Sequence, residues 1–297
     1  MQIKLFQNTE IDRKRWDKCI KQSNNQLSYA YTWYLDIVSP SWEALISENY
    51  EYVMPLPSKR KYGIPYLVQP ILTQQLGVFS KEVINEDIIN EFIKLLPSLS
   101  YELNLNDQNI HSNAVAYPNY ILNLNFTYQQ ISSQYTKNTH RNIDKSSKLD
   151  LKIKKNIPLE DFILFYYSVN KNFESPQQSI IEKLIDKGLI EKSMTLFGVY
   201  NNEKSLIAGL CILLSNHRLT YLLPISSAEG KSSSAMFFLI DKIIQNNAEK
   251  EIIFDFEGSS IEGIARFYKG FGAKNKPYYI LKRFRPSFLI SKINRKK

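Results

Sequence analysis

Glycine residues gather in one stretch of this sequence. Only 10 glycines occur in 297 residues, and five of them lie between positions 230 and 272. Glycine allows positive φ angles and a close approach of the backbone to a partner. The run Gly230, Lys231, Ser232, Ser233 and Ser234 lies between a predicted strand and a predicted helix. Free N–H groups and the helix dipole at such a junction favour a phosphate or pyrophosphate. The alternative is an ordinary loop in which Ser232 or Ser233 caps the helix.

A second group of candidate residues follows the next predicted strand, at 252–256. The chain reads Asp255-Phe256-Glu257-Gly258-Ser259 there, and the next predicted helix, 261–269, leads into Phe267-Tyr268-Lys269-Gly270-Phe271-Gly272. In order and spacing, these motifs resemble the Fem-type branch of the GNAT acyltransferase superfamily. That branch includes peptidoglycan aminoacyl transferases built from two GNAT-like domains. The basic segment 137–145 resembles the helix that opens the second domain there. The resemblance is good across 135–283 and weaker across 1–130.

The resemblance implies a fold and a reaction. The fold is of the α/β or α+β class, with two tandem GNAT-like domains, each a mixed twisted sheet flanked by helices. In the reaction, an amine attacks the carbonyl of an activated acyl donor held between strands 218–223 and 252–256. Tyr268 matches a tyrosine that often protonates the departing thiolate, a task that suits a phenol of pKa about 10. Glu257 is the candidate to take a proton from the acceptor ammonium before the attack, directly or through water.

Each of these catalytic assignments has a structural alternative. Tyr268 could pack in the core as one of 19 tyrosines. Glu257 could be a capping carboxylate before the helix that begins at Ile261. Asp255 could be a catalyst or a structural hydrogen-bond acceptor. The residues alone leave all three choices open.

The donor is also open between two classes. The resemblance implies acyl-CoA, with acetyl-CoA as the simplest case, its pyrophosphate on the amides of 230–234, and no metal. The usual donor loop reads Arg/Gln-x-x-Gly-x-Gly/Ala, and only Gly230 matches it well, which leaves aminoacyl-tRNA as the other donor. The acceptor is an amine on a small molecule or a cell-wall precursor. A non-catalytic binding module that kept the fold is the alternative from another class.

The elements that position these residues alternate between helix and strand along both halves of the chain. The first half contains a predicted hairpin over 42–56, a strand at 64–68, a helix at 87–96 and a strand at 101–105. The second half repeats this order at an offset of roughly 155 residues, which is typical of an internal duplication. We therefore predict an acceptor-side domain at 1–130, a donor domain at 131–283 and a basic tail at 284–297.

Charge is confined to short segments. The net charge is +9, but nine of the 38 Lys and Arg lie within 274–297, where no acidic residue occurs, and the other 29 balance 29 Asp and Glu. A second basic excess lies within 137–155. This distribution favours an anionic ligand or surface and argues against a DNA-binding protein. The tail combines cations with Phe and Ile residues, which predicts a peripheral contact with an anionic membrane; the alternative is packing on the domain.

Composition excludes several other classes. The two cysteines, Cys19 and Cys211, cannot form a disulfide framework or a four-ligand zinc site, and the three histidines are scattered. No apolar stretch is long enough for a membrane-spanning helix or a signal peptide. We therefore expect a cytoplasmic protein without a metal cofactor.

Overall fold

The computed structural model describes residues 1–61, 63–170, 175–215 and 217–284. Contacts between Cα atoms divide the chain into two compact units. The first unit comprises Met1–Tyr117 and the chain from Pro277 onward, and the second comprises Pro118–Lys276. The chain therefore passes between the units twice. Among the described helices, none is long and apolar enough to cross a membrane.

The first unit contains two sheets, with strand orders β1-β2-β3-β6 and β4-β5-β7-β16-β8. Its elements are β1 (Ile3–Phe6), η1 (Asn8–Glu10), α1 (Arg13–Gln22), η2 (Ser28–Ala30), α2 (Thr32–Val38), β2 (Glu43–Ser47), η3 (Glu48–Tyr50), β3 (Tyr52–Leu56), β4 (Ser58–Lys61), β5 (Ile64–Val68), β6 (Phe79–Ser80), α3 (Glu86–Lys94), β7 (Tyr101–Leu105), β8 (Val115–Tyr117) and β16 (Tyr278–Arg283). The amphipathic helix α3 begins after Asn85, whose side chain accepts from the Ile88 N–H. It buries Ile89 and Phe92 against the sheets.

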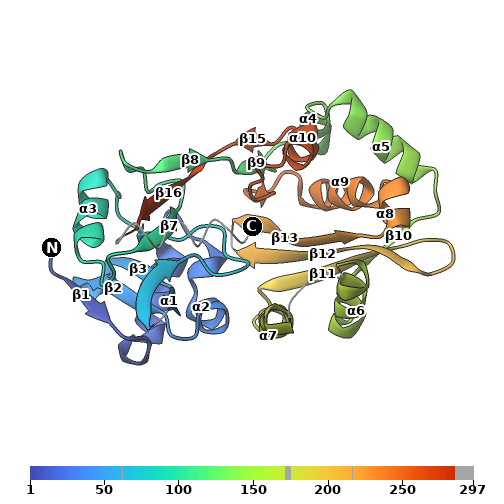
Figure 1. The fold of residues 1–297 in the computed structure, drawn as a ribbon. Coiled ribbons are helices and arrows are strands. Elements are labelled where there is room, and N and C mark those ends of the chain that lie inside the picture. The colour runs from blue at the N-terminus through green and yellow to red at the C-terminus, as the bar shows by residue number, and fades with distance from the viewer. Residues whose placement is uncertain (62, 171–174, 216, 285–297) are drawn as a thin grey trace. The chain divides into compact units, whose positions relative to one another are not determined.

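The second unit contains one sheet, in the order β10-β11-β12-β13-β14-β9-β15. Its elements are β9 (Tyr120–Asn123), α4 (Tyr128–Ser132), α5 (Lys137–Ser147), β10 (Lys152–Lys155), α6 (Leu159–Val169), α7 (Ser175–Ile190), β11 (Met194–Tyr200), β12 (Leu206–Ser215), β13 (Arg218–Ser226), α8 (Ala228–Ser232), α9 (Ala235–Asn247), β14 (Ile253–Asp255), α10 (Glu262–Gly270) and β15 (Lys274–Asn275). In this unit α9 covers one face of β11–β13, and α6 and α7 lie on the other (Figure 1). The buried residues of α9 pack into a core with Leu210 and Phe254.

Two strands lie in a different unit from the one that the sequence suggested. β9 falls within the predicted first domain, 1–130, yet it pairs with β14 in the second unit. β16 falls within the predicted donor domain, 131–283, yet it lies between β7 and β8 in the first unit. Alternation of side chains predicts that a segment is a strand, but its partners are chosen by long-range packing. Of the predicted tail, 284–297, the structure describes Phe284, and the other residues proposed to contact a membrane lie outside the described part.

Candidate active site

The parallel strands β13 and β14 separate soon after they pair. Their paired residues run from Arg218↔Ile253 to Thr220↔Asp255, where β14 ends, whereas β13 continues to Ser226. The register between β12 and β13 shifts so that Leu222 is an extra residue. Such a bulge bends a strand and increases its twist. The bulge therefore lies at the point where the two strands part.

Aromatic rings from several elements gather at this point. The Tyr268 ring of α10 has its centroid 5.0 Å from that of Phe256, 5.9 Å from Tyr221 on β13 and 6.0 Å from Tyr120 on β9. Only 7% of the Tyr268 surface is exposed. Tyr268 thus belongs to the core through its ring, as the structural alternative expected. The packing of the ring does not determine whether the hydroxyl can donate a proton.

The surroundings of Tyr268 keep its hydroxyl protonated. Burial raises the pKa of the phenol, and the negative charges of Glu257 and Asp255 raise this pKa further. A group whose pKa lies above the ordinary value of about 10 holds its proton at neutral pH, which is the form that a general acid needs. The Tyr268 ring packs 5.0 Å from that of Phe256, the residue that lies between Asp255 and Glu257 in the chain. The structure therefore brings together the three residues predicted to be catalytic.

Asp255 is committed to contacts within the protein. One of its carboxylate oxygens lies 2.5 Å from Nη1 of Arg218, and the two side chains are 2% and 14% exposed. The other oxygen accepts a hydrogen bond of 2.9 Å from the Glu257 N–H. These contacts are those of a hydrogen-bond acceptor that fixes the turn after β14.

Glu257 has a backbone conformation that is uncommon outside glycine. Its φ is +60°, and its carbonyl accepts a hydrogen bond of 3.0 Å from the Tyr120 N–H. A left-handed residue with a side chain costs about 1–2 kcal/mol, and such residues cluster at functional sites. The N-cap residue of α10 is Ile261, whose own side chain makes no cap bond and whose N–H donates to Oγ of Ser259 at 3.1 Å. The half-buried side chain of Glu257 follows directly on the aromatic cluster.

The predicted donor segment forms the short helix α8 and its connection to α9. Most of its amides already have acceptors, which differs from the free N–H groups expected there. The Gly230 N–H donates to Oγ of Ser227, and those of Lys231, Ser233 and Ser234 donate to backbone carbonyls. The side chains of Lys231 and Ser232 are exposed. The first turn of α9 also has amides without an acceptor inside that helix.

Gly230 is a glycine because of packing. A Cβ atom at this position would lie 2.1 Å from the carbonyl oxygen of Ile207 on β12. The same carbonyl accepts from the N–H and the hydroxyl of Ser227, the N-cap of α8. Close packing of helix on strand therefore accounts for Gly230 without a ligand. A substitution such as Gly230→Asp would therefore disturb folding through this contact and could not by itself test donor binding.

The basic segment 137–145 lies on α5, which packs against α9. Lys145 donates from Nζ to the Ser232 carbonyl at 2.6 Å, and the Ser234 hydroxyl donates to Oδ1 of Asn142 at 2.7 Å. These two bonds fix α5 beside the predicted donor segment. The exposed cations Lys137, Arg141, Lys145 and Lys148 lie along a hollow of about 690 Å³ on this helix.

Sequence reasoning missed two features of this site. The bulge at Leu222 was not predicted, although Pro224 in the same strand is a signal, because proline lacks an N–H and favours bulges and unpaired strand edges. Tyr221, which is 5% exposed, was taken only as part of a strand. Both features matter because of where the neighbouring strand β14 ends, and the sequence of β13 alone does not reveal that position.

The two cysteine thiols are not activated as nucleophiles, because burial disfavours the thiolate. Burial raises the pKa of the Cys19 thiol to about 11 and raises that of Cys211 further still. Both cysteines are free. Within the described ranges, no three His, Cys, Asp or Glu side chains are grouped as metal ligands.

No family profile and no curated protein matches the sequence. Solved structures do match the fold over nearly the whole chain. A structure of FemX has a TM-score of 0.70 at 11% identity and covers 98% of this chain and 99% of its own. The C-terminal domain of a putative lysylphosphatidylglycerol synthetase from Agrobacterium fabrum has a TM-score of 0.61 at 10% identity, with 96% of each chain covered. A tandem GNAT protein from the clavulanic acid biosynthesis pathway has a TM-score of 0.52 at 8% identity, with 95% and 98% covered.

These matches agree with the geometry of the second unit, where two parallel strands part beside a helix and a tyrosine. They also agree with the arrangement of three sheets flanked by helices in two units. The α/β fold inferred from the sequence motifs is confirmed. The chain has the Fem-like tandem GNAT fold, a fold shared with GNAT acyltransferases.

Proposed function

We propose that the chain is an N-acyltransferase that moves an acyl group from an activated donor to an amine. The observation that carries this proposal is the buried side chain of Tyr268, which packs on Phe256 between Asp255 and Glu257, where β13 and β14 part. A phenol that keeps its proton can donate it to a departing atom, and a neighbouring carboxylate can accept a proton from the acceptor. The acceptor would be a small molecule or a cytoplasmic cell-envelope precursor.

In the proposed reaction, Glu257 takes a proton from the acceptor ammonium, directly or through water. The amine nitrogen then forms a bond to the carbonyl carbon of the donor. As the bond from this carbon to the leaving sulfur or oxygen breaks, Tyr268 gives its proton to the leaving atom. The second proton of the attacking nitrogen then returns to the Tyr268 oxygen through water, and Glu257 releases its proton to solvent. Asp255 acts through its contacts: it holds the Glu257 backbone and the Arg218 guanidinium in place.

Acyl-CoA is the first donor class to test, with acetyl-CoA as the simplest member. Its pyrophosphate would lie near Lys231, Ser232 and the first turn of α9, since amides at a helix N-terminus favour anions. The hydroxyl of Ser232 is turned back to the Glu229 carbonyl at 3.0 Å and would have to rotate. Gly230, Ser233 and Ser234 would shape this segment without contacting the donor through their amides.

Aminoacyl-tRNA is a second donor class that a specific observation favours. The four exposed cations of α5 follow one another at intervals of three or four residues, so they lie along one side of the helix. This row is about 16 Å long at 1.5 Å per residue, which suits the regularly spaced phosphates of a nucleic-acid strand. Its third member, Lys145, contacts the segment proposed for the donor.

The test is turnover with each donor class and a panel of amines that includes cell-wall peptides, followed by mass spectrometry of the amide product. A product formed with acyl-CoA assigns the first class. A product that requires charged tRNA and is abolished by ribonuclease assigns the second. Donor binding without any product would overturn the enzymatic proposal and leave a binding module.

A further inference from the structure

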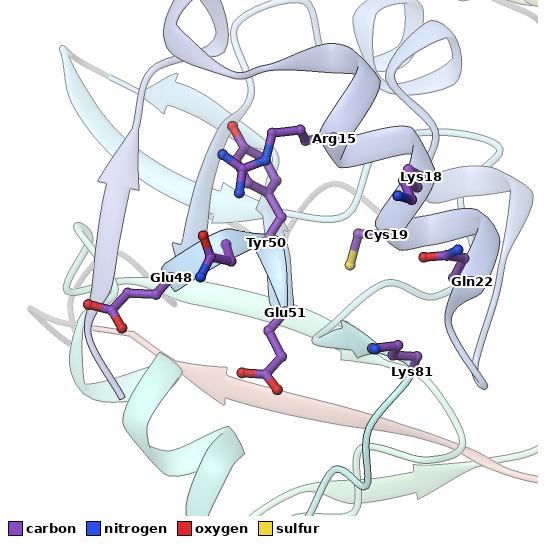
Figure 2. Close-up of a pocket in the computed structure, with 9 residues that line it drawn as sticks. Arg15, Lys18, Cys19, Gln22, Glu48, Tyr50, Glu51 and Lys81 are labelled. Atoms are coloured by element: carbon purple, nitrogen blue, oxygen red, sulfur yellow. The ribbon is translucent and has the colours of Figure 1, made fainter.

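The first unit has a cavity of about 560 Å³ that takes no part in the proposed reaction. It lies between α1 and the turn that joins β2 to β3 (Figure 2). Arg15, Lys18 and Cys19 enter it from α1, Tyr50 forms part of the opposite wall, and Lys81 comes from the chain after β6. The cavity is therefore built by three separate stretches of the sequence.

Cations approach this cavity from two elements. The guanidinium of Arg15 lies over the Tyr50 ring, 4.5 Å from its centroid. Among the described ion pairs, none includes Arg15 or Lys18, and Lys81 has an exposed pair with Glu82 at 3.6 Å. The cations thus remain available to an incoming anion.

The wall formed by the β2–β3 turn is held in an uncommon conformation. Asn49 and Tyr50 are consecutive left-handed residues, with φ of 58° and 61°. The Tyr50 hydroxyl accepts a hydrogen bond of 2.9 Å from the Asp12 N–H, at the start of α1. Together with the Arg15 contact, this bond fixes the turn against α1. Backbone strain that is maintained by surrounding contacts beside a cavity indicates a binding role.

The carboxylates on this wall restrict what the cavity can hold. Glu48 and Glu51 are exposed and line it together with the cations. They would repel a bare anion but would accept hydrogen bonds from a hydroxyl or an ammonium group. Guanidinium and ammonium groups are the usual partners of phosphate oxygens. The lining therefore suits a phosphate that has a polar hydrogen-bond donor attached nearby.

We propose that this cavity binds a phosphate monoester or diester of an amino alcohol or polyol, with the phosphate on Arg15, Lys18 and Lys81 and the amino or hydroxyl group toward Glu48 and Glu51. Such a group occurs on free small molecules and on lipid headgroups. The site is independent of the proposed acyl transfer, because it uses none of the same residues.

Cys19 provides a reporter inside the cavity. It is half-buried, whereas the other cysteine, Cys211, is fully buried and protected from reagents in the folded protein. Its pKa of about 11 makes alkylation by iodoacetamide slow enough to follow in alkaline buffer. The experiment measures the alkylation rate of Cys19 by peptide mass, with O-phosphoethanolamine, glycerol phosphate or sulfate at equal ionic strength. A phosphate ester at about ten times its dissociation constant should slow the rate about tenfold, and sulfate should not.

Two variants of α1 give a matched comparison. Lys18→Glu should abolish the protection, whereas Lys14→Glu should keep it, since Lys14 is exposed on the same helix but does not line the cavity. Both changes alter the net charge equally. Lys81→Gln, on another element, should weaken protection as well. Circular dichroism establishes that each variant is folded.

Vesicles distinguish the two sources of the phosphate ester. Protection by phosphatidylethanolamine vesicles alone would assign the cavity to a lipid headgroup, and protection by soluble esters alone would assign it to a small molecule. If neither slows alkylation, or if Lys18→Glu and Lys14→Glu are protected equally, the proposal is wrong.

Discussion

Each unit has one described parallel strand pair, β5–β7 in the first and β13–β14 in the second, and the two pairs continue differently. In the first unit, residues 69–75 leave β5 as a loop, after which Leu76 forms a parallel bridge to Leu105 on β7. The Asn104 side chain donates to the Gln74 carbonyl at 2.7 Å, which fastens this loop to β7. In the second unit, β14 ends where β13 bulges, and aromatic rings and carboxylates occupy the junction.

The two units also differ in whether their buried polar side chains can carry a charge. Of the described buried side chains, the carboxylates are Asp241 and Asp255, both in the second unit. In the first unit the buried polar groups include Gln75, Asn106 and Asn109. These are neutral amides: Gln75 donates to the side-chain oxygen of Gln74, and the other two donate to backbone carbonyls. The comparison teaches that a duplicated fold can use the same strand pair for packing in one copy and for titratable groups in the other.

The largest expected effect is on Tyr268. Tyr268→Phe should lower kcat by about 100-fold or more, the usual contribution of a positioned general acid, and should change donor affinity little because the ring contacts remain. Steady-state kinetics and calorimetry with the donor measure the two effects. The matched control is Tyr200→Phe, which removes a phenol hydroxyl elsewhere in the second unit. A kcat near that of the unaltered protein, with chemistry rate-limiting, would assign Tyr268 to packing alone.

The pH dependence of the activity gives a second test of Tyr268 as the proton donor. A raised pKa means that Tyr268 keeps its proton to higher pH than a free phenol does. Activity that needs this proton should therefore persist up to at least about pH 10. A decline near neutral pH that disappears in Tyr268→Phe would contradict the assigned environment.

The next effect concerns the helix that follows β13. Gly230→Ala should lower the free energy of unfolding by about 2–3 kcal/mol, because its Cβ would meet the Ile207 carbonyl and overpack the junction. Gly263→Ala in α10 is the control, since nothing lies within 4 Å of its Cβ position, and it should be neutral or stabilise by up to about 1 kcal/mol. Urea denaturation measures both. Equal free energies of unfolding for the Gly230→Ala and Gly263→Ala variants would show that α8 can move away from β12 at no cost in stability.

A smaller effect is expected at Asn104, which fastens the loop of residues 69–75 to β7 in the first unit. Asn104→Leu keeps a similar size but removes the donor to the Gln74 carbonyl, so it should cost about 1–2 kcal/mol of stability. Acyl transfer should be unaffected, because the loop serves packing in this comparison. Loss of activity at unchanged stability would instead give residues 69–75 a part in the reaction.

The smallest effect concerns Asp241 in α9, which accepts a hydrogen bond of 2.8 Å from the Tyr128 hydroxyl. Burial raises the pKa of this carboxyl despite that bond, so the folded protein binds its proton more tightly than the unfolded chain does. Asp241→Asn should therefore raise the melting temperature at neutral pH by roughly a few degrees. The gain should shrink as the pH falls through the folded-state pKa of Asp241, where the original carboxyl becomes neutral. A lower melting temperature at neutral pH would mean that the charge itself stabilises the fold.

Local patterns in the sequence identified elements well. The alternation over 101–105 predicted β7 with the bounds that the structure has, and the turn near Asn49 predicted the β2–β3 hairpin. Motif order predicted the tandem GNAT fold and the proximity of Tyr268 to Asp255 and Glu257. These features depend on residues close together in the chain or on a pattern shared with known proteins.

Features set by distant contacts could not be predicted. Position 230 requires glycine because the Ile207 carbonyl lies so close to it, and the ion-pair partner of Asp255 is Arg218, 37 residues away. Charge counting also overlooked α1, where Arg13, Lys14, Arg15, Lys18 and Lys21 occur with Asp17, because acidic residues elsewhere balance them in the total. Spatial grouping of charge requires the fold.

The return of β16 to the first unit has a consequence for biosynthesis. β16 is flanked by β7 and β8. In a nascent chain the sheet that contains β4, β5, β7 and β8 therefore lacks an inner strand until residues 278–283 leave the ribosome. At about 5–20 residues per second, the 160 or so residues after Tyr117 take roughly ten to thirty seconds to translate. During that interval the second unit can fold by itself, whereas β7 presents an unpaired edge. The N-terminal unit is thus the last to be completed, and a chain that stops at Lys276 would retain that exposed edge.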